Sequence, residues 1–246
     1  MKYIDLTFRD AERNLACDEA LLDACEEAGE LELLRVWEPR QPFVVLGYGN
    51  KVATEVNLTA CQSRQVPVLR RTSGGGTVLQ GAGCLNYSVL LRLGEGGPLQ
   101  SVTGTNRFVL AQNKLAIEEA AVRHGGVAPL PLQVLGTSDL ALGGLKFSGN
   151  AQRRKRTHLL FHGTFLLQFD LALIEQLLPL PSLQPDYRAG RAHRDFLTNL
   201  NLPADAVKLA LRRVWHAEEI FAETPWARIE ALATGKYATP EWNLKF

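Results

Sequence analysis

The chain has 246 residues, of which 46% are hydrophobic and 22% are charged, so it can bury a full core as one large domain. Its 27 lysines and arginines nearly balance 26 acidic residues, and the formal net charge of +1 excludes a global attraction to nucleic acid or membranes. There is no run of about 18 apolar residues and no apolar secretion segment at the start. We therefore expect a cytoplasmic protein whose four cysteines are reduced thiols.

Helical and strand patterns alternate along the chain, which predicts a mixed α/β protein. Apolar spacing predicts a helix over 14–28 that ends at Gly29, followed by strands at 33–37 and 43–47 with two prolines between them. A β-type run at 85–93 precedes a long helix over 106–124, which Gly125-Gly126 closes. Strand patterns return at 139–148 and 157–169, and the last predicted helix spans 204–217.

The most distinctive segment is Arg70-Arg71-Thr72-Ser73-Gly74-Gly75-Gly76-Thr77-Val78, which lies between two β-type runs. Three consecutive glycines let a ligand approach the main chain, and adjacent arginines supply donors for phosphate or carboxylate. The segment therefore predicts a site where an anion meets the backbone. A tight turn beside a solvated arginine pair is the alternative interpretation.

Gly143-Gly144 interrupts the alternating segment 139–148 and has the composition of a two-residue hairpin turn. Lys146 then lies on a strand, with Leu145 and Phe147 on one face and Lys146 and Ser148 on the other. A lysine on a strand commonly faces solvent or guards a sheet edge, so this pattern alone leaves its role open. The role of His162, in the next β-type run, is equally open between a ligand contact and an ordinary sheet residue.

Four consecutive cations, Arg153-Arg154-Lys155-Arg156, separate these two strand patterns. Such a run is typical of a solvated loop and, less often, of a phosphate or nucleic-acid surface. The sequence has no Gly-x-x-x-x-Gly-Lys-Ser/Thr loop, no Gly-x-Gly-x-x-Gly opening a helix, no His-Glu-x-x-His and no Gly-x-Ser-x-Gly. The standard nucleotide folds, a transition-metal site and a serine hydrolase are therefore not indicated, and we expect no nucleic-acid partner.

Four ordered segments resemble the lipoate protein ligase A family. Residues 14–22 are similar to its first helix, and 70–78 to Arg-Arg-x-Ser-Gly-Gly-Gly-x-Val. Residues 146–152 resemble Lys-(Val/Phe)-Ser-Gly-(Ser/Asn)-Ala, and 162–167 resemble His-Gly-(Thr/Ser)-(Leu/Ile)-Leu-Leu. The resemblance covers nearly the whole chain. It implies the catalytic-domain fold of biotin and lipoate ligases, with mixed, largely antiparallel sheets packed with helices, as a single domain over 1–246.

The resemblance implies an enzyme that uses ATP and Mg²⁺ to join lipoate or octanoate to AMP and then transfers the acyl group to a lysine of a lipoyl carrier domain. Lys146 would be the catalytic residue, bridging the acyl carbonyl oxygen and the α-phosphate. Arg71 would engage the ATP phosphates, and Asp139 would hold magnesium or the adenylate. Arg153 would begin a segment that closes over the adenylate. The remaining residues that the resemblance places at the ATP and lipoyl-adenylate site are Ser73, Gly74, Gly75, Gly76, Thr77, Val78, Leu79, Asn86, Ser148, Gly149, Ala151 and His162.

The chain departs from the family's pattern in two places. Gln80 stands where the family usually has histidine, so no imidazole can titrate there. Residues 239–243 resemble the end of the catalytic domain and are followed by three residues, so we expect no C-terminal accessory domain. A separate polypeptide could supply that accessory unit.

A transferase that moves octanoyl or lipoyl groups between carrier proteins through a cysteine thioester is the main alternative. Residues 130–139, where such relatives place the nucleophile, contain no cysteine, and Cys84 is more typical of a small buried residue. We therefore expect ligation. A non-catalytic acyl- or nucleotide-binding protein and a biotin ligase, whose loop typically reads Gly-Arg-Gly, are weaker alternatives. The charged segment 184–200 is expected to be a connecting loop or part of the surface that meets the carrier domain.

Overall fold

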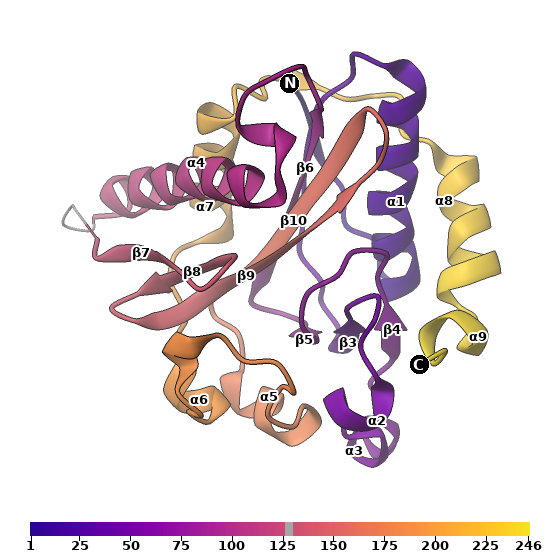
Figure 1. Ribbon diagram of the computed structural model, residues 1–246, viewed down its shortest axis with the longest axis vertical. Helices are drawn as coiled ribbons and strands as arrows, with labels where there is room; N and C mark the ends of the chain where they lie inside the picture. Colours follow the sequence, from indigo (N-terminus) through magenta and orange to yellow (C-terminus); the bar gives the residue numbers. More distant parts are fainter. Residues whose placement is uncertain (126–129) are drawn as a thin grey trace.

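The computed structural model describes residues 1–125 and 130–246, and within these residues the chain forms two sheets (Figure 1). The larger sheet has eight strands in the order β11-β1-β2-β6-β10-β9-β8-β7. These strands are β1 (Lys2–Asp5), β2 (Leu33–Trp37), β6 (Cys84–Arg92), β7 (Leu132–Leu135), β8 (Asp139–Leu142), β9 (Leu145–Arg154), β10 (His158–Leu166) and β11 (Glu219–Ile220). The smaller sheet has the order β4-β3-β5 and consists of β3 (Phe43–Leu46), β4 (Val68–Arg70) and β5 (Val78–Gln80).

Strand pairing is mixed but largely antiparallel. In the larger sheet β1 is parallel to β2 and β11, and the other described neighbours are antiparallel. In the smaller sheet β3 is parallel to β4 and antiparallel to β5. The predicted α/β class with mixed, largely antiparallel sheets is confirmed.

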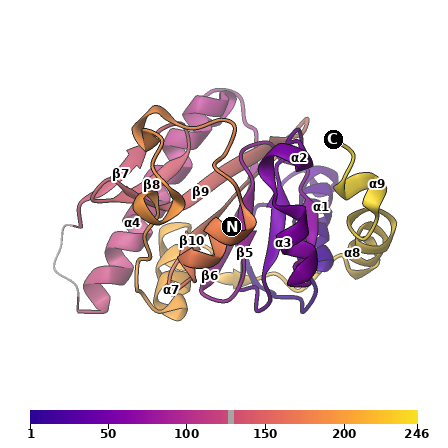
Figure 2. The same cartoon turned by 90° about the horizontal axis from the view of Figure 1, so that it is seen from below.

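Helices cover both faces of the larger sheet, with α1 and α8 on one side and α4 and α7 on the other (Figure 1). Figure 2 shows α2 and α3 beside the smaller sheet. The helices are α1 (Ala11–Ala28), α2 (Val52–Glu55), α3 (Leu58–Ser63), α4 (Val102–Arg123), α5 (Leu171–Leu177), α6 (His193–Phe196), α7 (Ala204–Val214), α8 (Trp226–Leu232) and α9 (Pro240–Asn243). Shorter turns are η1 (Pro98–Gln100), η2 (Asp186–Arg188) and the π-helical η3 (Ala233–Tyr237).

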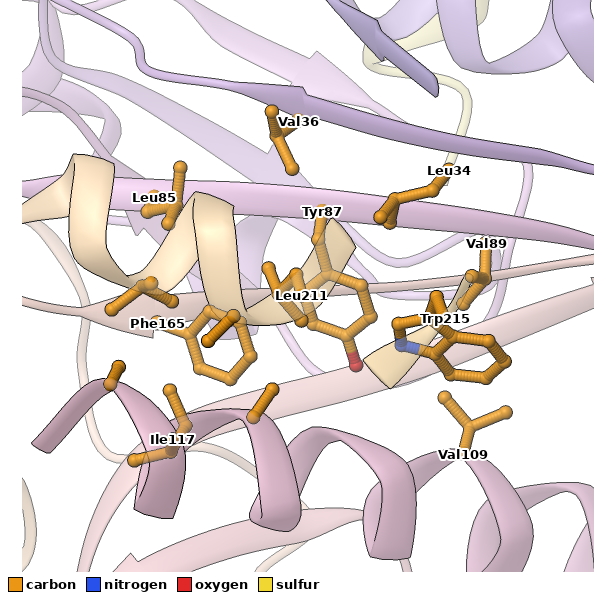
Figure 3. Close-up of a cluster of buried hydrophobic side chains, with 14 of the residues drawn as sticks. Leu34, Val36, Leu85, Tyr87, Val89, Val109, Ile117, Phe165, Leu211 and Trp215 are labelled. Carbon is orange, nitrogen blue, oxygen red and sulfur yellow. The ribbon is translucent and has the colours of Figure 1, made fainter. Parts of the chain in front are cut away.

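Strand β2 shows why the larger sheet needs cover on both faces. Leu34 and Val36 belong to the apolar cluster beneath α4 and α7, whereas Leu33 and Trp37 belong to the cluster beneath α1. Because successive side chains of a strand point to opposite faces, this fully buried strand contributes side chains to both clusters. Figure 3 shows the first cluster, in which side chains of β2, β6 and β10 meet those of α4 and α7.

Most predicted elements are confirmed, with shifted ends. The helix predicted over 14–28 is α1, which starts three residues earlier and ends before Gly29. The helix predicted over 106–124 is α4, which starts at Val102 because the Ser101 hydroxyl accepts a hydrogen bond from the Gly104 amide and caps it. Gly126, expected to close this helix, lies outside the described residues. The helix predicted over 204–217 is α7 and ends at Val214.

None of the helices in the two described ranges combines the length and apolarity that crossing a membrane requires.

Candidate active site

A cavity of about 440 Å³ lies between the smaller sheet and the β8–β9–β10 part of the larger sheet. One wall comes from the glycine loop, defined here as residues 71–77 between β4 and β5. Another comes from β8, β9 and β10, and a third from the segment 178–197. The predicted site residues that line it are Arg71, Gly75, Gly76, Thr77, Val78, Leu79, Asn86, Asp139, Lys146, Ser148, Gly149, Ala151 and His162. Residues as far apart as 71 and 162 are thus brought to one cavity, and their functional roles stay predictions.

Three predicted site residues lie elsewhere. Ser73 is 1% exposed, whereas Gly74 is exposed, and neither lines the cavity. Arg153 is exposed near the end of β9 that is farthest along the strand from Lys146. It does not line the cavity.

Half of the four-cation run is strand and not the expected loop, and its role over the adenylate stays a prediction. Arg153 and Arg154 are part of β9, because the strand pairing with β10 continues through them. Arg154 donates to the Leu99 carbonyl at 2.6 Å, and Lys155 forms an ion pair with Asp23 of α1. Arg154 and Lys155 therefore fix the end of the β9–β10 hairpin to neighbouring segments.

Arg71 organises the glycine loop from beneath. Its Nη2 donates to the carbonyls of Gly74 at 2.7 Å and Gly76 at 2.8 Å, and its Nε donates to Ser73 Oγ at 3.0 Å. In a trans peptide the carbonyl and the following N–H point in opposite directions, so the amides of Gly75 and Thr77 point away from the guanidinium. Across residues 1–125 and 130–246, no carbonyl or side chain accepts a hydrogen bond from the Gly75 or Gly76 amide. The loop therefore presents bare N–H groups beside the cavity, as an anion site requires.

Glycine is required at position 75. Its φ is +86°, and a Cβ there would lie 3.0 Å from Arg71 Nη2. A side chain would both strain the backbone and push against the guanidinium that holds the loop.

Neither arginine of the pair is solvated, so that alternative interpretation is wrong. Arg70 is fully buried, and its Nη1 donates to the carbonyls of Gly47, Tyr48 and Asn50. Burial lowers the pKa of Arg71 to about 10, so it remains charged at neutral pH. In this structure the guanidinium of Arg71 donates its hydrogen bonds to protein atoms, including Ser73 Oγ and the carbonyls of Gly74 and Gly76. Direct contact with ATP phosphates would need some of these hydrogen bonds to be exchanged.

Lys146 is held at the cavity by a short chain of polar contacts. Its Nζ lies 2.8 Å from Asp139 Oδ1, and the Tyr187 hydroxyl donates to Asp139 Oδ2 at 2.7 Å. Burial, followed by the nearby carboxylate, raises the pKa of Tyr187, so its hydroxyl stays a donor. The side chain of Lys146 is 24% exposed, which leaves its ammonium group accessible from the cavity.

The predicted β8–β9 hairpin is confirmed, but its pairing is irregular. Leu140 is opposite Ser148 and Ala141 is opposite Lys146, so Phe147 is an extra residue in a β-bulge. Phe147 is fully buried in the core, whereas Lys146 and Ser148 line the cavity. The predicted division of Phe147 from Lys146 and Ser148 is therefore confirmed.

Three uncharged side chains close a hydrogen-bonded ring in the cavity wall. Gln80 Nε2 donates to Thr164 Oγ1 at 2.6 Å, Thr164 donates to Asn86 Oδ1 at 2.5 Å, and Asn86 Nδ2 donates to Gln80 Oε1 at 3.0 Å. Gln80 therefore does more than replace a titratable imidazole. Its side chain holds the Asn86 amide and the Thr164 hydroxyl by hydrogen bonds and adds no charge.

Sequence reasoning missed two parts of the lining. Leu15, Trp37 and Val45 form an apolar wall, and nothing in their local sequence separates them from ordinary core residues. The segment expected to be a connecting loop or part of the carrier surface forms η2 and α6 and contributes Arg188, His193 and Phe196 to the lining. Its contact with a carrier stays a prediction. The clustering of charged and aromatic residues over 184–200 was the available signal.

All four cysteines, Cys17, Cys25, Cys61 and Cys84, are buried and unpaired. Burial raises the pKa of Cys17 to about 11 and the pKa values of Cys25 and Cys84 to about 12. Cys84 packs in the apolar cluster around the smaller sheet and is not among the residues that line the cavity. None of these thiols has the accessible, easily ionised character of a nucleophile.

The residues present fit magnesium that arrives with a nucleotide. Mg²⁺ commonly takes one or two protein carboxylates and completes its shell with phosphates and water. Asp139 supplies one carboxylate at the cavity, although here its two oxygens contact Lys146 and Tyr187. No cluster of three or more metal-binding side chains occurs in the part of the chain that the structure describes.

Comparisons with known proteins agree with this architecture. A crystal structure of a lipoate-protein ligase A bound with ATP superposes with a TM-score of 0.79 over 99% of this chain and 98% of that chain, at 23% identity, which shows the same fold. The octanoyltransferase LipM of Geobacillus kaustophilus is 27% identical, covering 99% of this chain and 98% of the relative. Lipoate–protein ligase 1 of Staphylococcus aureus is 25% identical, covering 99% of this chain and 73% of the relative. The family model for the lipoyl protein ligase A/B catalytic domain matches residues 10–210, and the chain therefore belongs to that family of lipoate ligases and octanoyltransferases.

Proposed function

We propose that this protein is an ATP-dependent lipoate-protein ligase. The family contains both ligases and transferases, so the choice depends on whether the chain has a nucleophile. Burial of all four cysteines, with raised pKa values, is the observation that carries the proposal. A thioester mechanism needs an accessible thiolate, whereas adenylation needs only positioned charge and donors.

In the proposed reaction a lipoate carboxylate oxygen attacks the α-phosphorus of ATP, and the bond to pyrophosphate breaks. The amine of a carrier lysine then attacks the acyl carbon, AMP leaves, and the amine loses a proton. Lys146 is the candidate to neutralise the charge that develops on the acyl oxygen and the α-phosphate in both steps. Its ammonium group at the cavity and the bare amides of the glycine loop support this role.

The proposed ligands follow from the same residues. Arg71 and the glycine loop would meet the phosphates, and Asp139 would share Mg²⁺ with the nucleotide. Lipoate or octanoate would lie against the apolar wall of Leu15, Trp37 and Val45. The acceptor would be a lipoyl carrier domain, with or without a separate accessory polypeptide.

The test separates the two steps. The purified protein is incubated with lipoate, MgATP and no carrier, and we expect pyrophosphate release, with the same rate in Cys84→Ser. Transfer is then measured by adding a lipoyl carrier domain and detecting its mass increase. Pyrophosphate release without transfer would assign only the first step to this chain and call for the accessory polypeptide.

Octanoyl transfer is the second candidate. It is favoured by the similarity to the octanoyltransferase LipM, 98% of whose length aligns with this chain. It predicts transfer from an octanoyl carrier protein to a second carrier without ATP. Absence of lipoate-dependent pyrophosphate release, together with ATP-free transfer that Cys84→Ser abolishes, would replace ligation by transfer.

A further inference from the structure

A line of polar contacts connects the buried centre of the protein to the glycine loop. Asp18 of α1 forms a buried ion pair with Arg35 of β2, its Oδ1 lying 2.6 Å from Arg35 Nη1. Asp18 Oδ2 lies 3.5 Å from His162 Nδ1, and His162 Nε2 lies 2.6 Å from Ser73 Oγ. Ser73 Oγ in turn accepts from Arg71 Nε at 3.0 Å. Four segments distant in sequence thus meet in one chain of contacts.

The direction of each hydrogen bond follows from the chemistry of the end groups. The Arg35 and His162 contacts lower the pKa of Asp18 against the opposing effect of burial, so the carboxylate is ionised and can only accept. Because a carboxylate only accepts, the tautomer of His162 that pairs with Asp18 carries its proton on Nδ1, and Nε2 of that tautomer is an acceptor. Ser73 consequently donates to His162 while it accepts from Arg71.

The order Ser-His-Asp resembles that of a nucleophilic triad, but the surroundings are different. Ser73 is 1% exposed and is not among the residues lining the cavity, so an acyl group cannot reach its oxygen. A lone pair of that oxygen is also occupied by the Arg71 guanidinium. The arrangement is suited to fixing a conformation.

We infer that Asp18 and His162 are positioning residues that orient the Ser73 hydroxyl and, through it, the Arg71 guanidinium beneath the glycine loop. The guanidinium then holds the carbonyls of Gly74 and Gly76, and the opposite amides face away from it. This role rests on the proposed adenylation for its catalytic effect, but the effect on the loop itself does not depend on which reaction the site performs.

Two substitutions at His162 distinguish its contact with Ser73 from its contact with Asp18. In His162→Gln the terminal amide lies near the former Nε2 and can still accept from Ser73. In His162→Asn the shorter amide reaches only toward Asp18. We expect kcat for pyrophosphate release to fall about 10- to 100-fold in His162→Asn and only about threefold in His162→Gln, with KM for lipoate nearly unchanged in both. Ser88→Ala is the control, because Ser88 also donates to Asp18, at 2.9 Å, but lies outside the route to the loop.

Hydrogen exchange measures the loop directly. Amides of residues 74–78 should exchange faster in His162→Asn than in the wild-type protein and His162→Gln, while amides of α4 stay protected. Equal exchange and equal kcat in the two His162 variants, or a raised KM with unchanged kcat, would overturn the inference. An acyl adduct on Ser73 detected by mass spectrometry would also overturn it. If the wild-type protein releases no pyrophosphate, the proposed function fails while hydrogen exchange still tests the positioning role.

Discussion

Lys146 illustrates how a residue gains meaning from its contacts. A single lysine on a strand is uninformative, but this one lines the same cavity as the glycine loop and lies 2.8 Å from a carboxylate. The position of Lys146 after a Gly-Gly turn could be predicted from the sequence. Its contact with Asp139 and the contact of Asp139 with Tyr187 could not, because the latter joins residues 48 positions apart.

Replacing Lys146 by glutamine should reduce pyrophosphate release by about 100-fold or more, because the developing charge loses its cationic partner. The free energy of unfolding should change by less than about 1 kcal/mol, since this partly exposed ion pair contributes little stability. Initial rates and urea unfolding measure the two effects.

Lys155→Gln is the matched control for this substitution. Lys155 follows the end of β9 that is opposite to Lys146 and pairs with Asp23, away from the cavity lining. Its rate should stay within about twofold of wild type, as is usual for a surface charge. Similar losses of activity in the two variants would remove the special role of Lys146.

At the level of elements, α7 shows how a surface helix is held by one face. Leu211 is fully buried in the cluster with α4 and the sheet (Figure 3). Leu209 on the same helix is 43% exposed. Trp215, just after the helix, donates from Nε1 to Asn113 of α4 at 3.0 Å. Apolar spacing predicted the helix, but its partner helix, 102 residues away in sequence, came only from tertiary packing.

Leu211→Ala should lower the free energy of unfolding by about 2–5 kcal/mol, because it removes buried methyl groups and leaves a cavity. Leu209→Ala should change it by no more than about 0.5 kcal/mol. Urea unfolding of both variants provides the comparison. A loss for Leu209→Ala as large as that for Leu211→Ala would mean that the helix packs through a different face.

At the level of the whole molecule, the buried thiols couple stability to alkaline pH. The folded-state pKa values of Cys17, Cys25 and Cys84 are about 11, 12 and 12, above the value of about 8.5 for a thiol in an unfolded chain. The folded protein therefore holds these protons more tightly. The contribution of these thiols to the free energy of unfolding is fully present below about pH 8.5 and is lost as the pH rises above it.

Between pH 7.5 and 9.5 we expect the free energy of unfolding to fall by about 1 kcal/mol for each of these three thiols. Urea unfolding at the two pH values, in the presence of a reducing agent, measures the total. In Cys84→Ala the fall should be smaller than in the wild-type protein by about 1 kcal/mol. A pH dependence that is the same in both proteins would show that Cys84 does not contribute.

The sequence by itself determined the α/β class, the main helices and strands, and the two motifs that carry the candidate chemistry. These features are local, since they depend on side-chain periodicity, turn residues and runs of glycine that neighbouring residues reveal. Tertiary structure alone decided that Arg71 holds the loop from beneath, that Arg153 lies on a strand away from the cavity, and that Asp18, His162 and Ser73 are in contact. Those facts depend on strand register and on burial, which arise only when segments far apart in the chain pack together.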